Sequence, residues 1–210
     1  MRRYAYKSVK KGGECVKKLL ITGFEPFGGE SLNPSWEAVC LLPDRIGEWA
    51  LTKLCIPVVF GEAARCVINA AEEIRADVVL CIGQAGGRDA VTPEFVGINL
   101  AHASIPDNAK KQPLDEPIIA DGAAAYFVTV EARRMVEAIK SRGIDAKPSY
   151  SAGTYVCNEV LYLVLAHFDG TDTRVGFIHV PFEASQAKHG VASMPLCDMV
   201  SALTAAIESL

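Results

Sequence analysis

Short apolar runs that stop at a glycine or a proline alternate along this chain with segments of helical spacing. The clearest run is DVVLCIG at residues 77–83. Similar runs occupy residues 18–23, 51–59 and 175–180. A short run that is apolar on both faces is typical of a strand buried inside a parallel sheet. With helical spacing at residues 61–76 and 130–142, the alternation predicts an α/β fold, a single three-layer α/β/α domain with a mostly parallel central sheet.

Three further helices are expected. One opens after Asn33, where proline occupies the first turn, and a second follows the turn at residues 151–157. The third closes the chain within residues 189–210, with Met194 and Pro195 interrupting its start.

A long irregular segment, residues 84–117, follows the clearest strand. It is rich in Gly, Pro, Asp and Asn, and only residues 95–100 within it have the pattern of a strand. Another short strand is expected near residues 147–150. A long segment of this kind after a central strand is more often functional than structural filler.

Polar or glycine-rich residues follow the ends of several predicted strands. They are residues 23–29, residues 83–99, residues 151–157 and His179. Ligands of open α/β sheets bind beyond the carboxyl ends of the strands. We therefore expect these segments to converge on one edge of the sheet.

The glycine-rich segments do not predict a nucleotide site. Gly23 and Gly28 have the separation found in a P-loop, but Gly29 and Glu30 stand where lysine and a hydroxyl residue are needed. No Gly-x-Gly-x-x-Gly pattern follows any predicted strand, so the dinucleotide fingerprint is absent as well.

Charge is distributed unevenly along the chain. The formal net charge is −4, yet residues 1–18 hold seven Lys or Arg and one acid, which leaves −10 for the remainder. An acidic body argues against nucleic acid as the partner, and no apolar stretch reaches the length of a membrane span. Residues 1–17 lack the apolar core of a secretory signal, and we expect a disordered basic extension or an upstream translation start before a domain at residues 18–210.

The seven cysteines predict neither a disulfide framework nor a zinc site. Their number is odd, none forms a Cys-x-x-Cys pair, and several lie inside apolar runs. This pattern is typical of reduced thiols in the cytoplasm.

Cys157 differs from the other cysteines because it follows a small-residue turn and begins a long apolar run. The first amides of a helix lack internal partners and carry partial positive charge. A thiol placed there should ionise more easily than a free cysteine, whose pKa is about 8.5, and should have backbone donors nearby for an oxyanion. The alternative is a small buried residue at a helix start.

A cysteine nucleophile needs a base. His167 lies ten residues further along the same predicted helix, about 15 Å away at the usual rise, and is too distant. His189 lies in a polar segment and is expected at the surface. His102, in the long irregular segment, and His179, at the end of a buried strand, both remain candidates.

The base in turn needs a group that orients it. Glu25, Asp89 and Glu94 are the candidate acids, and Glu94 has an apolar setting between Pro93 and Phe95. The alternatives for Glu94 are a surface position or an ion pair with Arg88.

Eight segments together resemble one family, pyroglutamyl peptidase I (pyrrolidone-carboxylate peptidase), whose members are cysteine peptidases that remove an N-terminal pyroglutamyl residue. The segments are TGFEPFGG at 22–29, NP at 33–34, GQAGGR at 83–88, IPDN at 105–108, DEPI at 115–118, AAYF at 124–127, AGTYVCN at 152–158 and GFIHVP at 176–181. Each is weak alone, but all eight keep the family's order and spacing from about Lys18 to the C-terminus.

The resemblance implies that Cys157 is the nucleophile, His179 the general base and acid, and Glu94 the residue that orients the histidine. It also implies a single α/β/α domain that often assembles as a homotetramer and uses no metal or cofactor. The implied pyroglutamyl pocket consists of Phe24, Phe27, Tyr155 and Val156, with Asn33 and the main chain of Gln84 contacting substrate. Such a slot suits a neutral lactam, which has no ionised amine for an acid or metal to hold.

The chain departs from the family pattern at two positions. Phe95 stands where the family usually has arginine after the catalytic glutamate, and Ser104 stands where it usually has arginine before IPDN. Lys110, Lys111 or Arg88 are candidates for a substitute cation. Two alternatives follow: a cysteine amidohydrolase that acts on another neutral lactam or amide, and a homologue that binds pyroglutamyl peptides without cutting them.

Overall fold

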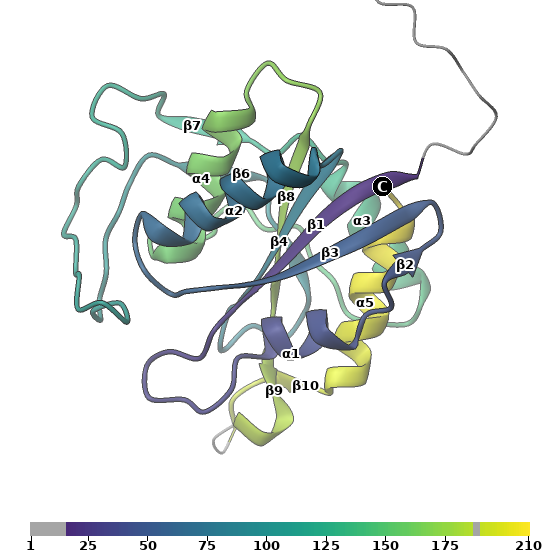
Figure 1. The fold of residues 1–210 in the computed structure, drawn as a ribbon. Coiled ribbons are helices and arrows are strands. Elements are labelled where there is room, and N and C mark those ends of the chain that lie inside the picture. Colours follow the sequence, from purple (N-terminus) through teal and green to yellow (C-terminus); the bar gives the residue numbers. More distant parts are fainter. Residues whose placement is uncertain (1–15, 187–189) are drawn as a thin grey trace, which may run out of the picture.

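A six-stranded sheet in the order β2-β3-β1-β4-β8-β5 runs through the centre of the computed structural model, which describes residues 16–186 and 190–210 (Figure 1). Its four long strands are parallel: β3 (Trp49–Ile56), β1 (Lys17–Phe24), β4 (Val78–Gln84) and β8 (Arg174–Val180). Two short strands, β2 (Arg45–Ile46) and β5 (Thr92–Pro93), pair antiparallel at the two edges. The predicted mostly parallel sheet is confirmed.

Five α-helices in the described residues cover the two faces of the sheet (Figure 1). The helices α2 (Glu62–Ile74) and α4 (Val156–Phe168) pack together on one face, and α1 (Pro34–Leu41), α3 (Ala132–Ser141) and α5 (Leu196–Glu208) lie on the other. The three-layer arrangement predicted from the alternation of strands and helices is therefore confirmed.

The central strands are apolar throughout because both of their faces are buried. In β1, Leu19 and Ile21 join the core cluster under α1, α3 and α5, whereas Leu20 joins the cluster under α2 and α4. In β4, Leu80 and Cys81 divide in the same way. Successive side chains of a strand point to opposite faces, so a strand between two layers needs an unbroken apolar run.

Smaller pairings lie outside the central sheet. An antiparallel pair joins β6 (Val96–Ile98) to β7 (Ala125–Phe127), which confirms the strand predicted at residues 95–100. A parallel pair joins β9 (Phe182–Glu183) to β10 (Ser193–Met194), and the short 3₁₀ helix η1 (Ala184–Gln186) follows β9.

The strand predicted near residues 147–150 is wrong. The chain runs beside β5 there, but it forms only two isolated bridges, Val91 with Ala146 and Glu94 with Ser149. Pro93 stands between the two bridges and has no N–H to donate, so the ladder is interrupted.

Two boundary predictions concern the ends of the chain. The closing helix begins at Leu196, directly after Pro195, as the interruption at residues 194–195 predicts. The first strand begins at Lys17, and the residues before Val16, like His189, lie outside the described residues. No helix in the described part of the chain combines the length and apolarity needed to cross a membrane.

The contact between β1 and the start of α1 leaves no room for a side chain at Gly23. A Cβ atom there would lie 2.6 Å from Trp36 Cα and 2.7 Å from Trp36 N. The helix begins at this point because the Asn33 side chain accepts a hydrogen bond from Ser35 N, which caps it. This close packing fixes the loop at residues 24–33 relative to the strand ends.

We expect Gly23→Ala to lower the free energy of unfolding by about 1–3 kcal/mol, because the atoms in the way belong to the helix backbone and cannot rotate aside. Thr52→Ala, at an exposed position of β3, is the control and should cost about 0.5 kcal/mol or less. Urea unfolding followed by circular dichroism measures both variants. Equal losses in the two variants would contradict the packing argument.

Candidate active site

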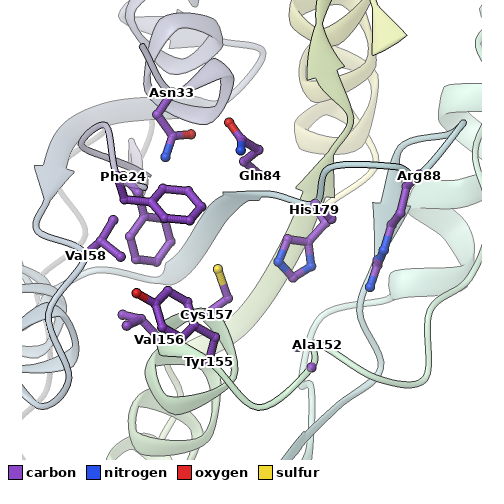
Figure 2. Close-up of a pocket in the computed structure, with 13 residues that line it drawn as sticks. Phe24, Asn33, Val58, Gln84, Arg88, Ala152, Tyr155, Val156, Cys157 and His179 are labelled. Carbon is purple, nitrogen blue, oxygen red and sulfur yellow. The ribbon is translucent and has the colours of Figure 1, made fainter. Parts of the chain in front are cut away.

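A pocket of about 170 Å³ lies at the carboxyl-terminal edge of the sheet (Figure 2). Three of its residues come from strand ends: Phe24 from β1, Gln84 from β4 and His179 from β8. All six predicted pocket residues line it, together with Cys157 and His179; the six are Phe24, Phe27, Asn33, Gln84, Tyr155 and Val156. The predicted convergence of the strand ends is confirmed.

Cys157 is the second residue of α4, and its thiol points into the pocket (Figure 2). The turn before it contains Gly153 at a φ of 78°, a conformation that favours glycine. On the strand side, Gly83 makes room for the sulfur, since a Cβ there would lie 3.0 Å from Cys157 Sγ and 2.8 Å from the Phe177 ring. The thiol is therefore held between a helix start and a strand that carries no side chain at this point.

The predicted easy ionisation of Cys157 is wrong for the protein without substrate. Burial, with a smaller contribution from the negative charge of Glu94, raises the pKa of the thiol to about 12. The positive charge of Arg88 and the backbone hydrogen bond at the helix start lower this pKa, but they offset only part of the effect. Sequence indicates the helix start, whereas the burial depends on packing around the sulfur that only the fold reveals.

Asn158, the next residue, fixes α4 to the long irregular segment. Its side-chain Oδ1 accepts a hydrogen bond from Ile98 N at 3.0 Å, and its Nδ2 donates to Ile98 O at 2.9 Å and to Leu100 O at 3.0 Å. The Asn158 side chain is fully buried. The backbone beside the nucleophile is thus held by groups from a segment about 60 residues away in the sequence.

His179 and Glu94 form a buried pair behind the pocket wall. The distance between His179 Nδ1 and Glu94 Oε1 is 2.7 Å, and both side chains are almost completely buried. With Nδ1 occupied by the carboxylate, Nε2 is the ring nitrogen left to exchange a proton. In Figure 2 the imidazole ring and the Cys157 thiol both face the pocket.

The surroundings keep Glu94 charged and His179 neutral. Burial raises the pKa of Glu94, but the hydrogen bond from His179, with contributions from Ser149 and Arg88, brings it below its ordinary value. Burial lowers the pKa of His179, and Glu94 restores only part of that loss. A neutral imidazole beside a carboxylate has the protonation state of a general base.

The other acids and histidines considered in the sequence lie elsewhere. Glu25 Oε1 accepts hydrogen bonds from Val58 N and Asn108 Nδ2, which ties two loops together. Asp89 pairs with Lys147, His102 with Asp115, and His167 with Glu72, all outside the pocket core. Of the three candidate acids, Glu94 is the one that contacts His179.

Of the two alternatives for Glu94, the surface position is wrong because the residue is fully buried, whereas the ion pair with Arg88 exists beside the contact with His179. Its Oε1 atom lies 2.7 Å from Arg88 Nη1 as well as 2.7 Å from His179 Nδ1. Of the three cations considered as substitutes for a missing arginine, Arg88 is the one that reaches Glu94. At the two departing positions, Phe95 packs against Tyr150 with 5.1 Å between ring centroids, and Ser104 is exposed.

The polar pocket residues already use some of their hydrogen-bonding groups in contacts within the protein. Asn33 Nδ2 donates to Glu25 O at 3.0 Å, and its Oδ1 accepts from Ser35. Gln84 Oε1 accepts a hydrogen bond from Gln186 Nε2 at 3.2 Å.

Aromatic rings pack together beside the pocket. Tyr155 packs against Phe27 with 6.1 Å between ring centroids and against Phe60 with 5.3 Å.

Five lining residues were not predicted for the pocket: Val58, Ala85, Arg88, Ala152 and Gly153. Four of them lie inside the segments GQAGGR and AGTYVCN, so the motifs contained the signal. Val58 follows the end of β3 and has no motif of its own. Within residues 16–186 and 190–210, no group of three His, Cys, Asp or Glu side chains could hold a metal ion.

Known proteins of one family are similar to this chain. The family model described as pyroglutamyl peptidase matches residues 17–210. The chain is 46% identical to the pyrrolidone-carboxylate peptidase of Lactobacillus helveticus over 195 residues, which cover 91% of this chain and 98% of the relative. It is 48% identical to that of Levilactobacillus brevis over 198 residues, with 92% and 97% covered. The chain belongs to the pyroglutamyl peptidase family.

Solved structures agree with this assignment. The crystal structure of pyroglutamyl peptidase I from Bacillus amyloliquefaciens matches with a TM-score of 0.89 at 41% identity, covering 92% of this chain and 94% of that one. The pyrrolidone carboxyl peptidase from Thermococcus litoralis matches with a TM-score of 0.87 at 35% identity, with 92% of each chain covered. As a member of the pyroglutamyl peptidase family, the protein is a cysteine peptidase.

The raised pKa of Cys157 predicts slow alkylation of the free protein at neutral pH. The rate with iodoacetamide should rise about tenfold for each pH unit into the alkaline range, because only the thiolate reacts. Peptide mapping by mass spectrometry separates Cys157 from the exposed thiols of Cys40, Cys55 and Cys197, and Cys157→Ser is the control. A rate that is already maximal and flat across neutral pH would reveal a thiolate and contradict the assignment.

Proposed function

We propose that the protein removes the N-terminal pyroglutamyl residue of peptides through a thioester acyl-enzyme. Cys157 is the nucleophile, His179 the general base and acid, and Glu94 the residue that orients the histidine. The observation that carries the proposal is the 2.7 Å contact between His179 Nδ1 and Glu94 Oε1, because His179 lines the same pocket as Cys157. The relatives named pyrrolidone-carboxylate peptidase support the choice of substrate.

The pocket has the chemistry that a pyroglutamyl ring requires. The ring is a neutral lactam without an ionised α-amine, so a charged anchor would have nothing to hold. Phe24, Phe27 and Val58 supply apolar walls, and Asn33 and Gln84 supply polar groups for the lactam amide (Figure 2). The apolar walls favour burial of the ring, and the polar groups offset the cost of burying its amide.

Acylation begins with a neutral thiol and a neutral imidazole. As Cys157 Sγ attacks the exocyclic carbonyl carbon, His179 Nε2 accepts the thiol proton, and the C=O bond opens to an oxyanion. The backbone amides of the first turn of α4, which has no side-chain cap, are the candidate donors to this charge. When the C–N bond breaks, His179 gives its proton to the departing amine, and a thioester remains on Cys157.

Deacylation repeats these steps with water. His179 Nε2 takes a proton from the attacking water, a second oxyanion forms, and the C–S bond breaks to release pyroglutamate. The sulfur recovers its proton from His179. The imidazolium form of His179 appears twice in this cycle. The Glu94 carboxylate stabilises it by accepting a buried hydrogen bond from Nδ1–H.

Release of aminocoumarin from a pyroglutamyl amide tests the proposal. We expect Cys157→Ser and His179→Ala to reduce kcat/KM by roughly 10³-fold or more, since each removes a group that makes or breaks bonds. Glu94→Gln should retain slow turnover, on the order of 10²-fold below the unsubstituted protein, because it removes only the charge beside the histidine. No release by the unsubstituted protein would refute the proposal.

Two controls separate the alternatives. Selective alkylation of Cys157 at alkaline pH with no turnover of pyroglutamyl amides would favour a cysteine amidohydrolase for another neutral lactam or amide. A rise in melting temperature with a pyroglutamyl peptide, without product, would favour a binding homologue. Cys55→Ser, which changes a thiol outside the pocket, is the matched control for Cys157→Ser and should leave kcat/KM unchanged.

We also propose a homo-oligomer, a tetramer by family resemblance, in the cytoplasm. Large apolar side chains are exposed on the single chain, with Phe127 at 75% and Leu114 at 63% of their surface, and a partner subunit would cover some of this area. The six cysteines of the described residues are free thiols, which suits a reducing compartment. Sedimentation velocity tests the assembly, and a monomer at micromolar concentration would contradict it.

A further inference from the structure

Arg88 lies at the junction of the elements that carry the three candidate catalytic residues. It follows β4 after Gly87, whose φ of 86° turns the chain back. Its side chain is only 29% exposed and lines the pocket on the side of His179 (Figure 2). The mechanism above gives this side chain no role.

One end of the guanidinium fixes the carboxylate of Glu94. Arg88 Nη1 donates to Glu94 Oε1 at 2.7 Å, the same oxygen that lies 2.7 Å from His179 Nδ1. Glu94 Oε2 is buried and has no hydrogen-bond partner within the described structure. The orientation of this carboxylate therefore depends on the two donors that share one oxygen.

The other end of the guanidinium holds the segment that leads to the nucleophile. Arg88 Nη2 donates to Ser151 O at 3.0 Å, and Nη1 lies 3.3 Å from Ser149 Oγ. Ser151 begins the small-residue turn that ends at Cys157. Nη1 also donates to Thr92 Oγ1, which in turn lies 3.4 Å from the backbone oxygen of His179.

These contacts favour a positioning role over a substrate anchor. Four protein oxygens occupy the guanidinium, and a cation has no partner on a neutral pyroglutamyl ring. We propose that Arg88 is a positioning residue: it sets the Glu94 carboxylate toward His179 and, through Ser151, holds the turn that presents Cys157 to the same histidine. The inference rests on the proposed function.

The charge of Arg88 acts on His179 in the opposite direction to that of Glu94. Burial lowers the pKa of His179, Glu94 raises it through its hydrogen bond and charge, and Arg88 lowers it. The titratable or charged groups that face this histidine are thus Glu94 after β5, Arg88 after β4 and the Cys157 thiol on α4. Removing Arg88 should raise the pKa of His179, whereas removing the charge of Glu94 should lower it.

The test compares Arg88→Gln, Arg88→Lys and the surface control Arg65→Gln, which removes an exposed arginine of α2. For Arg88→Gln we expect kcat to fall by about 10²-fold with KM changed by less than about threefold. The acid limb of its kcat/KM profile should move to higher pH, because protonated His179 cannot accept the thiol proton. The limb of Glu94→Gln should move to lower pH, and that of Arg65→Gln should stay in place.

Arg88→Lys separates charge from geometry. A lysine keeps the positive charge, so the acid limb should stay near its original pH. Its single ammonium cannot reproduce the planar fork that reaches both Glu94 and Ser151, so kcat should remain at least about tenfold reduced. A large rise in KM with unchanged kcat in Arg88→Gln would identify a substrate anchor and overturn the inference. Unchanged kcat and pH profile would overturn it as well.

A substrate-free measurement keeps the inference testable if the proposed function fails. The imidazole pKa of His179, followed by NMR in the Cys157→Ser background, should rise when Arg88→Gln is added and stay put when Arg65→Gln is added. An unshifted pKa would refute the positioning role whatever the substrate is. If Arg88→Gln does not fold, the kcat of Arg88→Lys decides the question. A fully active Arg88→Lys would then count against the required fork geometry.

Discussion

The buried carboxylate of Glu94 is the constraint on which the rest of the site depends. A carboxylate removed from water costs several kcal/mol unless donors and positive charge compensate for it. His179 and Arg88 supply that compensation on a single oxygen, Oε1. The two donors come from β8 and from the loop after β4, so the sheet edge must assemble before the charge can be buried. Stability and chemistry therefore share the same three side chains.

The Cys157 thiol and the His179 imidazole are both neutral before substrate binds, because both are buried. The thiol of Cys157 has a raised pKa and the imidazole of His179 a lowered one, so neither carries charge until a carbonyl enters the pocket. Because oxidants and alkylating agents react with thiolates, a neutral thiol is protected while the pocket is empty. The charge that develops during reaction then appears next to the amides of α4 and the carboxylate of Glu94. A neutral ring and a neutral site also avoid the cost of desolvating ions when substrate binds.

Most of the fold was predictable because the buried faces of helices and strands determine the spacing of apolar residues in the sequence. The run at residues 77–83 became β4 (Val78–Gln84) within one residue at each end, since both faces of that strand are covered. The convergence of strand ends placed Cys157 and His179 on one pocket, and the family resemblance pointed to Glu94. The strand near residues 147–150 failed because a proline in the neighbouring strand, Pro93, breaks the ladder.

Properties that depend on distant contacts were not predictable. The pKa of Cys157 is set by burial of the sulfur and by the charges of Glu94 and Arg88, which come from other parts of the chain. The partners of Arg88 in the turn, Ser149 and Ser151, are 61 and 63 residues away in the sequence. The sequence indicates Arg88 as a candidate partner of Glu94, but no pattern in it connects Arg88 with the turn that carries the nucleophile.

The three hydrogen bonds of Asn158 have a consequence for the order in which the enzyme matures. They join the residue after the nucleophile to Ile98 and Leu100, so a contact between segments about 60 residues apart is needed before Cys157 is held in place. Contacts of such separation form late, because closing the intervening chain costs entropy. A newly made chain would therefore acquire its helices before its activity. Its nucleophile becomes competent only when the irregular segment docks, which makes turnover a reporter of completed folding.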